Sequence, residues 1–245
     1  MTMRRAAGAA LATGFLLCLV AAVAVTALGV RIDGTSMAPT LHQGDRILVA
    51  PGSAGQVGRF DVVLLRATGK ETLLVKRVIG LPGDRVAIVS TPEEPFLVLL
   101  QKGGEGPVYR VVAGQWEDRA RRTGACCGPD GTRSARSGLR AVPEGSFFYL
   151  GDNPDLSDDS RTYGWGDIAR VEGRVGVRAF PVSASPDIGN RPVLEEYRGP
   201  GPQDLRFPDP GGGGSFSRPV LSATRTTVSA MRRADSPGDE ADWTM

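Results

Sequence analysis

Ser36 lies in a short loop whose residues are suited to presenting a nucleophile. Gly34 stands two positions before it, and a glycine lets another chain approach the backbone closely. Pro39 follows, and a proline biases the preceding residue, Ala38, toward an extended conformation. Most serines in loops of this kind are only turn residues. A catalytic interpretation of Ser36 therefore depends on finding a base elsewhere in the chain.

Two kinds of side chain can serve as a base for Ser36. His42 is the single histidine, but it lies six residues away on the exit of the same loop, and no geometry recommends it. A neutral lysine amine is the alternative, because Ser-Lys pairs perform the same proton transfer as Ser-His-Asp triads. Only three of the 29 basic residues are lysines, and two of them, Lys70 and Lys102, adjoin glycine in predicted turns. The third is Lys76.

Lys76 lies in an apolar segment that meets the requirements of a base. Side chains alternate along a strand, so Leu74, Lys76 and Val78 share one face. Burial among hydrocarbons disfavours the cation and lowers the pKa of a lysine. To lower that pKa from about 10.4 to about 7–8, the surroundings must destabilise the cation relative to the neutral amine by roughly 4 kcal/mol. The competing interpretation is a lysine whose stem lies on the sheet while its amine reaches water.

Composition argues against two other kinds of site. The formal net charge of +2 over 245 residues argues against a nucleic-acid binder driven by bulk charge. A structural zinc site needs about four Cys or His ligands at paired spacings, which one histidine and three cysteines do not provide. We do not expect the adjacent Cys126 and Cys127 to form a structural disulfide framework. Bridged Cα atoms usually lie about 4.4–6.8 Å apart, so two neighbouring cysteines could form a disulfide only with strain.

An uncharged segment of 25 residues, Ala6–Val30, precedes the Ser36 loop. At about 1.5 Å per residue it is long enough to cross a hydrocarbon core of about 30 Å. Arg4 and Arg5 precede it, which keeps the amino terminus in the cytoplasm and sends the rest outward. A cleaved signal peptide is the alternative, but its apolar core is usually only about 7–15 residues long. We therefore predict an uncleaved anchor.

The chain after the anchor alternates short apolar runs with turns. This spacing favours antiparallel strands over βαβ units, and no convincing amphipathic helix appears outside the anchor. We therefore expect a mainly β fold. The predicted strands are Arg46–Val49, Asp61–Arg66, Leu73–Ile79, Arg85–Val89, Phe96–Leu100, Val108–Val112, Phe147–Leu150 and Val171–Arg178.

Residues 91–143 and 183–245 carry weaker structural signals. Within the first, Lys102–Arg140 has eight basic and four acidic residues, a net charge of +4. Beside a bilayer such a loop could contact anionic headgroups at roughly 1 kcal/mol per basic residue, although a solvated loop is the simpler interpretation. The second has eight Pro and eight Gly in 63 residues, which is typical of a flexible tail.

The chain resembles the type I signal peptidases, membrane-anchored Ser/Lys endopeptidases that remove signal peptides from exported preproteins. The resemblance covers about Gly34 to Val182 and rests on five blocks in the family's order. The general-base block, Lys76–Asp84, matches in full. The other four are Ser36–Leu41 around the nucleophile, Gly44-Asp45, Arg59–Val63 and Gly151–Arg161.

The resemblance implies an architecture and a location. It implies a signal-peptidase-like catalytic domain of antiparallel sheets behind one N-terminal transmembrane helix. The expected parts are a cytoplasmic segment 1–5, the anchor 6–30, an extracytoplasmic domain 31–182 with a variable insertion 91–143, and the tail 183–245. The domain would lie outside the plasma membrane, with membrane lipid and the protein translocation machinery as partners. No metal, cofactor or nucleic acid is implied.

The resemblance also implies roles for individual residues. Ser36 would be the nucleophile and Lys76 the general base, while Ser157 would hold the Lys76 amine by a hydrogen bond. The substrate would be an extended signal-peptide segment with small residues, typically Ala, at the first and third positions before the cut. The supporting residues are the ion pairs Asp159–Arg161 and Asp152–Arg77, and the substrate and oxyanion loop residues Gly34, Met37 and Pro39.

Two departures from the family pattern bear on activity. Pro154 stands where most members have Arg. Gly34 stands where some members carry a serine whose hydroxyl helps to bind the oxyanion, so the backbone N–H of Ser36 must do more of that work. Losing one such donor can lower the rate about 10²–10³-fold. Two alternatives stay open: a specialised Ser/Lys peptidase for one precursor, and an inactive homologue that only binds export substrates.

Overall fold

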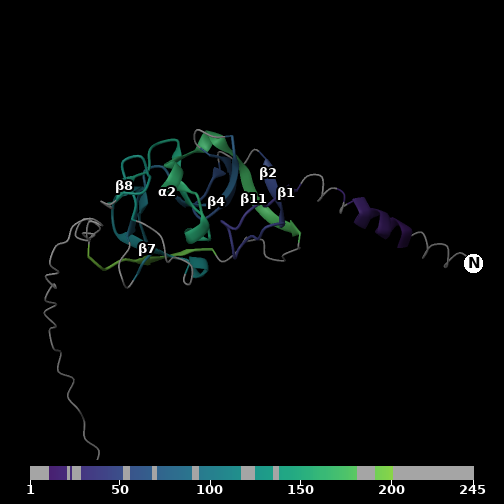
Figure 1. Ribbon diagram of the computed structural model, residues 1–245, viewed down its shortest axis with the longest axis horizontal. Helices are drawn as coiled ribbons and strands as arrows, with labels where there is room; N and C mark the ends of the chain where they lie inside the picture. The colour runs from purple at the N-terminus through teal and green to yellow at the C-terminus, as the bar shows by residue number, and fades with distance from the viewer. Residues whose placement is uncertain are drawn as a thin grey trace, which may run out of the picture. The chain divides into compact units, whose positions relative to one another are not determined.

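Two antiparallel sheets form the described part of the protein (Figure 1). The computed structural model describes residues 11–20, 23, 29–51, 56–67, 71–89, 94–116, 125–134, 138–180 and 191–200. The seven-stranded sheet has the order β1-β2-β11-β3-β4-β9-β10, and the five-stranded sheet has the order β12-β7-β6-β5-β8. The predicted mainly β, antiparallel fold is confirmed.

The elements are short, as expected for strands separated by tight turns. The seven-stranded sheet contains β1 (Val30–Arg31), β2 (Arg46–Pro51), β3 (Val62–Arg66), β4 (Leu73–Gly80), β9 (Ser146–Leu150), β10 (Gly166–Asp167) and β11 (Val171–Phe180). The five-stranded sheet contains β5 (Arg85–Val89), β6 (Leu97–Gln101), β7 (Val108–Val112), β8 (Arg140–Ala141) and β12 (Val193–Glu196). The helical turns are η2 (Lys102–Gly104), η3 (Gly114–Trp116), η4 (Pro154–Leu156), α2 (Ser160–Tyr163) and η5 (Ile168–Arg170).

β4 lies between β3 and β9 in the seven-stranded sheet. Its register pairs Lys76 with Val63 of β3 and Arg77 with Leu150 of β9. β3 is a run of Val and Leu that is buried over Val62–Leu65, which is typical of a strand covered on both faces. The sheet therefore holds Lys76 in a strand whose neighbour is built from hydrocarbon side chains.

The two sheets share one apolar core. Ile79 and Phe148 of the seven-stranded sheet pack in the same cluster as Val86, Ile88 and Leu100 of the five-stranded sheet. Each fully buried aliphatic side chain stabilises the fold by about 1.5–3 kcal/mol. Because β5, β6, β7 and β8 lie between β4 and β9 in the chain, most of the five-stranded sheet is an insertion that is packed onto the sheet containing it.

Residues 125–134 form a segment around a disulfide between Cys126 and Cys127. Both cysteines are fully buried, and Cys126 forms an isolated β-bridge with Ile88 of β5. The peptide bond between them is cis, and their Cα atoms lie 3.0 Å apart. The interpretation of these cysteines as no structural framework is therefore wrong, because it applied the usual Cα spacing of disulfides to adjacent residues.

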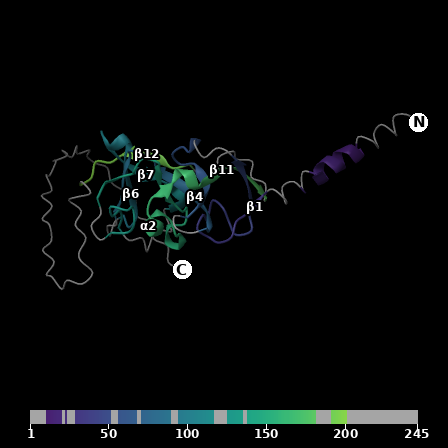
Figure 2. The same cartoon turned by 90° about the horizontal axis from the view of Figure 1, so that it is seen from above.

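Part of the predicted flexible tail is a strand. β12 pairs with β7 over its whole length, and the two lie side by side in Figure 2. Just before β12, Arg191 Nη2 donates to the carbonyl of Arg59 at 2.8 Å. The tail prediction is thus wrong for 191–200, because a partner strand supplies the hydrogen bonds that local composition does not reveal. Residues 183–190 and 201–245 lie outside the described residues.

The predicted anchor is described only in part. Residues 11–20 are helical, as is Val23, whereas 6–10, 21–22 and 24–28 lie outside the described residues. Of the residues that the structure describes, no helix combines the length and hydropathy needed to span a bilayer. The anchor over 6–30 stays a prediction.

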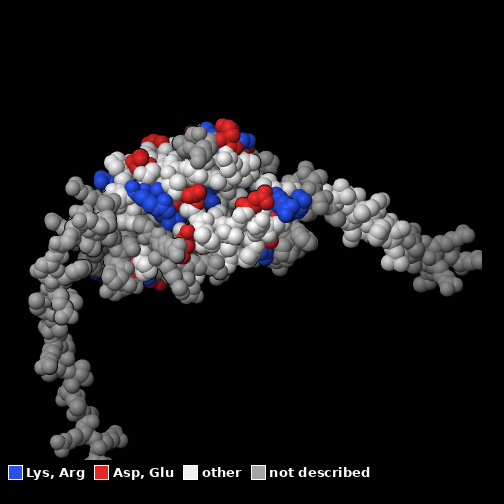
Figure 3. Space-filling model, in the orientation of Figure 1, with Lys and Arg blue, Asp and Glu red and all other residues white. Residues whose placement is uncertain are grey.

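Acidic residues from other segments partly neutralise the basic stretch Lys102–Arg140. Arg110 Nη1 lies 3.0 Å from Glu94 Oε1, and Arg110 Nε lies 4.0 Å from Glu195 Oε2 of β12. On the face shown in Figure 3, acidic and basic side chains lie next to one another. Contact between this stretch, which includes the undescribed residues 117–124 and 135–137, and a lipid surface stays a prediction.

Candidate active site

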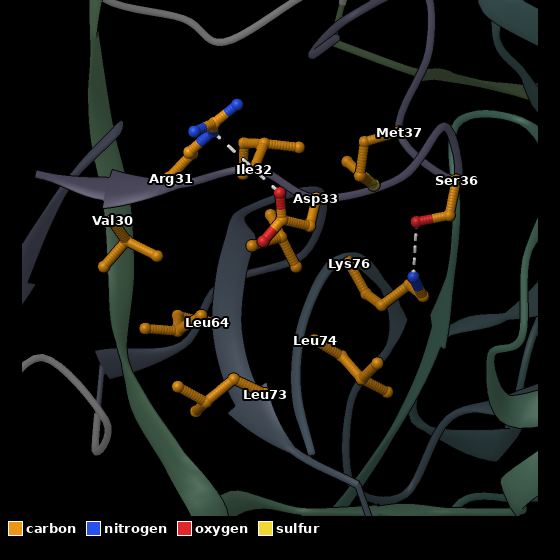
Figure 4. Close-up of a pocket in the computed structure, with 11 residues that line it drawn as sticks. Val30, Arg31, Ile32, Asp33, Ser36, Met37, Leu64, Leu73, Leu74 and Lys76 are labelled. Carbon is orange, nitrogen blue, oxygen red and sulfur yellow. Dashed lines mark hydrogen bonds and ion pairs between the residues drawn. The ribbon is translucent and has the colours of Figure 1, made fainter. Parts of the chain in front are cut away.

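Two separate elements bring Ser36 and Lys76 together (Figure 4). Lys76 projects from β4, and Ser36 lies in the loop between β1 and β2. The Lys76 Nζ atom lies 2.7 Å from Ser36 Oγ, which is hydrogen-bond distance. The amine and the hydroxyl are therefore close enough for direct proton transfer.

The loop that carries Ser36 is held in place by buried side chains. Met37 and Leu41 lie in an apolar cluster with residues of β2 and β3, and the Leu41 N–H donates to the Met37 carbonyl at 2.9 Å. Gly34 has a φ of 102°, in the left-handed region that glycine adopts readily. Pro39 is exposed. The loop is thus anchored by its apolar residues on one side of Ser36 and turned by a glycine on the other.

Burial lowers the pKa of the Lys76 amine from 10.5 to about 8. Desolvation is the main cause; the carboxylates of Asp159, Asp158 and Asp152 oppose it, and Arg161 adds a smaller lowering effect. Lys76 is only 2% exposed. The predicted desolvation is confirmed, and an amine that reaches water is excluded. Near pH 8 about half of the amine is neutral and able to accept a proton.

Arg77 and Asp152 form a buried ion pair beside Lys76. Arg77 Nε donates to Asp152 Oδ1 at 2.8 Å, and Arg77 Nη2 donates to Asp152 Oδ2 at 2.6 Å. Such bidentate pairing fixes both position and orientation. Arg77 also donates to the Phe60 carbonyl, and the Thr40 hydroxyl donates to Asp152 Oδ2 at 2.5 Å. The pair therefore connects β4 to the loop that carries the serine.

Asp159 and Arg161 form the second buried ion pair of the site. Asp159 is the N-cap of α2, and its carboxylate accepts hydrogen bonds from Arg161 Nε and Nη2, both at 2.8 Å. Asp159 Oδ2 also accepts from the Gly151 N–H at 3.1 Å, and Arg161 Nη2 donates to the Pro154 carbonyl at 2.8 Å. Both predicted ion pairs are thus present, and Pro154 contributes a backbone acceptor to one of them.

A pocket of about 260 Å³ opens beside the Ser36–Lys76 pair (Figure 4). Ile32, Met37 and Leu74 line it together with the charged Arg31 and Asp33, so its wall is partly hydrocarbon and partly polar. A pocket next to a nucleophile is where a peptide segment can bind. Within the described residues, no group of three or more His, Cys, Asp or Glu side chains is placed to hold a metal ion.

Comparison with known proteins decides the family. The family model described as signal peptidase, peptidase S26, matches residues 4–180, which is more than half of the chain. The chain belongs to this signal peptidase family.

Relatives of this peptidase carry the same family description in their names. Signal peptidase I of Bacillus caldolyticus is 38% identical over 152 residues, which cover 61% of this chain and 78% of that protein. Signal peptidase IB of Staphylococcus aureus (strain COL) is 32% identical over 162 residues, covering 62% and 77% respectively. The chain also matches a crystal structure of a signal peptidase I from Enterococcus faecalis V583, with 25% sequence identity and a TM-score of 0.35. This match covers 49% of the present chain and 96% of the Enterococcus chain.

Ser157 forms no hydrogen bond to the lysine of this peptidase among the described residues. Its Oγ is buried and has no hydrogen-bond partner among the described residues. The hydroxyl lies against Gly151, where an added Cβ would overlap it. The predicted hydrogen bond from Ser157 to Lys76 is therefore wrong for this arrangement, in which the amine meets Ser36 Oγ instead.

His42 lies apart from the catalytic chemistry of the peptidase. Its side chain is exposed, and its backbone N–H donates to the carboxylate of Asp45 at 2.9 Å. It forms no hydrogen bond to Ser36 among the contacts of the described residues. This placement favours Lys76 over His42 as the base, in agreement with the sequence.

Sequence reasoning did not single out two residues that contact the nucleophile loop. Thr40 binds Asp152, as described above, and Asn153 donates to the carbonyl oxygens of Thr35 and Ser36. The only sequence signal for either residue is its place inside a matched block. Their roles become visible only when the last block folds against the first.

Proposed function

We propose that this peptidase removes signal peptides from exported preproteins, with Ser36 as nucleophile and Lys76 as general base. The observation that carries the proposal is the 2.7 Å contact between Ser36 Oγ and a lysine amine whose pKa burial lowers to about 8. Membership of the signal peptidase family supports the substrate class. A buried neutral amine has no evident structural use, because it is costlier to bury than a hydrocarbon.

The proposed reaction has two stages. As Ser36 Oγ attacks the carbonyl carbon of the scissile bond, the Lys76 amine accepts the serine proton. The tetrahedral intermediate then expels the amine of the mature protein, which takes that proton from the Lys76 ammonium. The resulting acyl-enzyme is an ester on Ser36. Water, losing a proton to Lys76, attacks this ester, and the second tetrahedral intermediate releases the signal peptide as its carboxyl-terminal acid. The Lys76 ammonium returns the proton to Ser36 Oγ, which restores the free serine and the neutral amine.

The two ion pairs have distinct proposed tasks in this reaction. Arg77–Asp152 ties β4 to the serine loop through Thr40, so it sets the distance between amine and hydroxyl. Asp159–Arg161 lies behind the amine, and its carboxylate favours the ammonium that forms during the reaction. Charges fixed before the reaction need no reorganisation when the transition state forms.

The pocket supports a preference for small residues before the cut. It lies beside Ser36, and the hydrocarbon part of its wall, which includes Ile32, Met37 and Leu74, offers no partner for a polar side chain. Arg31 and Asp33 form part of the remaining wall. We propose that small side chains such as Ala, at the first and third positions before the cut, face this region. Gly34 and Pro39 shape the loop and do not line the pocket.

The proposed location is the outer surface of the plasma membrane. The support is the uncharged segment 6–30, which only five residues separate from Ser36. A helix over that segment would hold the catalytic site at the lipid surface where exported precursors emerge. Membrane lipid and the translocation machinery are the proposed partners.

Incubation of the detergent-solubilised protein with a preprotein carrying an Ala-X-Ala cleavage site tests the function. We expect cleavage by the wild type and a loss of roughly 10⁴-fold or more in Ser36→Ala and Lys76→Ala. Lys76→Arg should be equally inactive, because a guanidinium does not give up its proton in this range. His42→Ala is the matched control and should cleave normally. Cleavage of only one native precursor would indicate the specialised peptidase, and no cleavage at all would indicate the inactive homologue.

The dependence of kcat/KM on pH tests the assignment of the base. Below the pKa of Lys76, about 8, the amine is protonated and cannot accept the serine proton. We therefore expect kcat/KM to rise with pH and to level off above that value, with a rate at pH 6 about 100-fold below the plateau. A rising limb that disappears in His42→Ala would assign the base to the histidine instead.

A further inference from the structure

Asn153 holds two successive carbonyl groups of the nucleophile loop. Its backbone N–H donates to the Ser36 carbonyl at 2.9 Å, and its side-chain Nδ2 donates to the Thr35 carbonyl at 3.2 Å. Asn153 is 5% exposed, so water does not compete freely for these bonds. The side-chain bond joins residues 118 positions apart, which makes it a tertiary contact and not a feature of a local turn.

The bond to the Thr35 carbonyl determines where the Ser36 N–H points. The carbonyl of one residue and the N–H of the next lie in the same plane and point in opposite directions across a trans peptide. With the Thr35 oxygen held toward Asn153, the Ser36 N–H faces away from that residue. No acceptor among the described residues takes a hydrogen bond from the Ser36 N–H. The group is therefore free to bind an oxygen of the substrate.

Gly34 makes this N–H more important. A glycine has no hydroxyl to share the charge of an oxyanion, so the amide of the nucleophile carries more of it. A carbonyl that accepts a hydrogen bond polarises its own peptide group and strengthens the N–H on the opposite side. The Thr35 carbonyl accepts one bond within the loop, from the Ala38 N–H at 3.1 Å, and a second from Asn153.

We propose that the Asn153 side chain is a positioning residue that aims the Ser36 N–H at the oxyanion of the tetrahedral intermediate. Asn153 is not among the residues that line the pocket beside Ser36, and it acts through the Thr35–Ser36 peptide group. The inference rests on the proposed peptidase function and adds to it a residue that controls stabilisation of the transition state. Because the backbone N–H of residue 153 still holds the Ser36 carbonyl in every variant, substitution of the side chain isolates the bond to Thr35.

Two variants and a control test this role. Asn153→Ala deletes the donor, and Asn153→Leu removes it while keeping the branched shape and the number of side-chain heavy atoms, so that the two variants differ in the packing defect they cause. Leu156→Ala, an exposed position on the adjacent turn η4, is the matched control. We expect kcat to fall about 10- to 100-fold in both Asn153 variants, less than for outright removal of an oxyanion donor. KM and the rising limb of the pH profile should stay at the wild-type values, because neither substrate contacts nor Lys76 are altered.

Inhibitor affinities separate positioning from structural support. A peptide aldehyde forms a tetrahedral adduct with a serine, whereas the product peptide ending in Ala-X-Ala binds without one. We expect the aldehyde to bind more weakly in both Asn153 variants, by the same factor as kcat/KM falls, and the product peptide to bind as in the wild type. Unchanged kcat, or equal weakening of aldehyde and product, would overturn the inference. Failure of the wild type to cleave any preprotein would instead contradict the proposed function on which it rests.

Discussion

The two sheets bury different kinds of side chain. In the strands of the five-stranded sheet, every buried residue is Val, Ala, Ile or Leu. In the seven-stranded sheet, β4 buries Lys76 and Arg77, and the segment after β9 adds the buried carboxylates of Asp152 and Asp159 with Arg161. One sheet is therefore a hydrocarbon layer, and the other surrounds a set of charges.

This difference indicates what each sheet contributes. Buried ion pairs are often no more stabilising than hydrophobic residues of similar volume. The charges around Lys76 therefore have a better explanation in the electrostatics of the amine than in the stability of the fold. The five-stranded sheet carries no buried charge on its strands, and its contribution is apolar packing against β4 and β9.

The largest effect on stability is expected from breaking a buried ion pair in the seven-stranded sheet. Asp159→Ala leaves Arg161 buried without its carboxylate, and should lower the free energy of unfolding by about 3–5 kcal/mol. Glu172→Ala, which breaks a largely exposed pair with Arg66, should lower it by no more than about 1 kcal/mol. Urea unfolding of both variants measures the difference, and equal losses would contradict the importance of burial for the Asp159–Arg161 pair.

A cavity in the five-stranded sheet should lower stability without changing the chemistry. Leu99 is fully buried on β6, so Leu99→Ala should lower the free energy of unfolding by about 2–5 kcal/mol. The kcat of the folded fraction, determined by active-site titration, should equal that of the wild type. The exposed Val193→Ala serves as the control. A large fall in kcat for Leu99→Ala would show that this sheet shapes the site directly.

Lys76→Met should stabilise the fold at neutral pH while it abolishes activity. The pKa of Lys76 is about 8 in the folded chain, whereas the unfolded chain has the ordinary lysine value of 10.5. Between pH 8 and pH 10.5 the unfolded chain therefore binds a proton that the folded chain does not. The wild type therefore gains stability as pH rises from 8 to 10.5, and below pH 8 it carries a penalty of about 3 kcal/mol.

Replacing the amine by a thioether removes that penalty. We expect Lys76→Met to gain up to about 3 kcal/mol at pH 7 and little at pH 10.5, measured by urea unfolding at both pH values. The exposed Lys102→Met should show no such pH-dependent gain. A destabilised Lys76→Met at pH 7 would mean that the amine is satisfied by its surroundings and not strained by burial.

The smallest effect is expected at the edge of the five-stranded sheet. A chain ending after Pro200 should keep the stability and kcat of the full chain. A chain ending after Asn190 loses β12 and the bond from Arg191, and should unfold with about 1 kcal/mol less free energy, because β12 is mostly exposed. Its kcat should be unchanged. Thermal unfolding and the preprotein cleavage assay check both chains. If the chain ending after Asn190 were inactive, β12 would belong to the catalytic machinery.

Strands with dense apolar sequences could be predicted almost to the residue. Arg85–Val89 and Val108–Val112 have the predicted bounds, because Gly and Pro turns flank runs of Val, Ile and Leu. β12 could not be predicted, since Val193–Glu196 has only two apolar residues in a Pro- and Gly-rich context. Strands of only two residues, such as β1, could not be predicted either. β1 is a strand because it pairs with β2, and the sequence of two residues does not reveal such a partner.

The central pair of the site could be predicted because strand alternation and apolar flanks already favour a desolvated Lys76. The ion pairs followed from the family resemblance. The orientation of Ser157 Oγ and the contact of Asn153 with Thr35 could not be predicted, because each depends on how a turn after β9 packs on a loop before β2. Such contacts have no periodicity in the sequence.

The position of β2 in its sheet sets the order in which the protein can mature. The serine loop lies between β1 and β2, and β2 lies between β1 and β11, whose residues come more than 120 positions later in the chain. Pairing over such a separation closes a large loop and is slower than forming a local hairpin such as β3–β4. Ser36 therefore reaches its final surroundings only after β11 has been synthesised. A nascent chain that has not yet acquired β11 should be a latent peptidase, which contains Ser36 and Lys76 without the complete sheet that positions them.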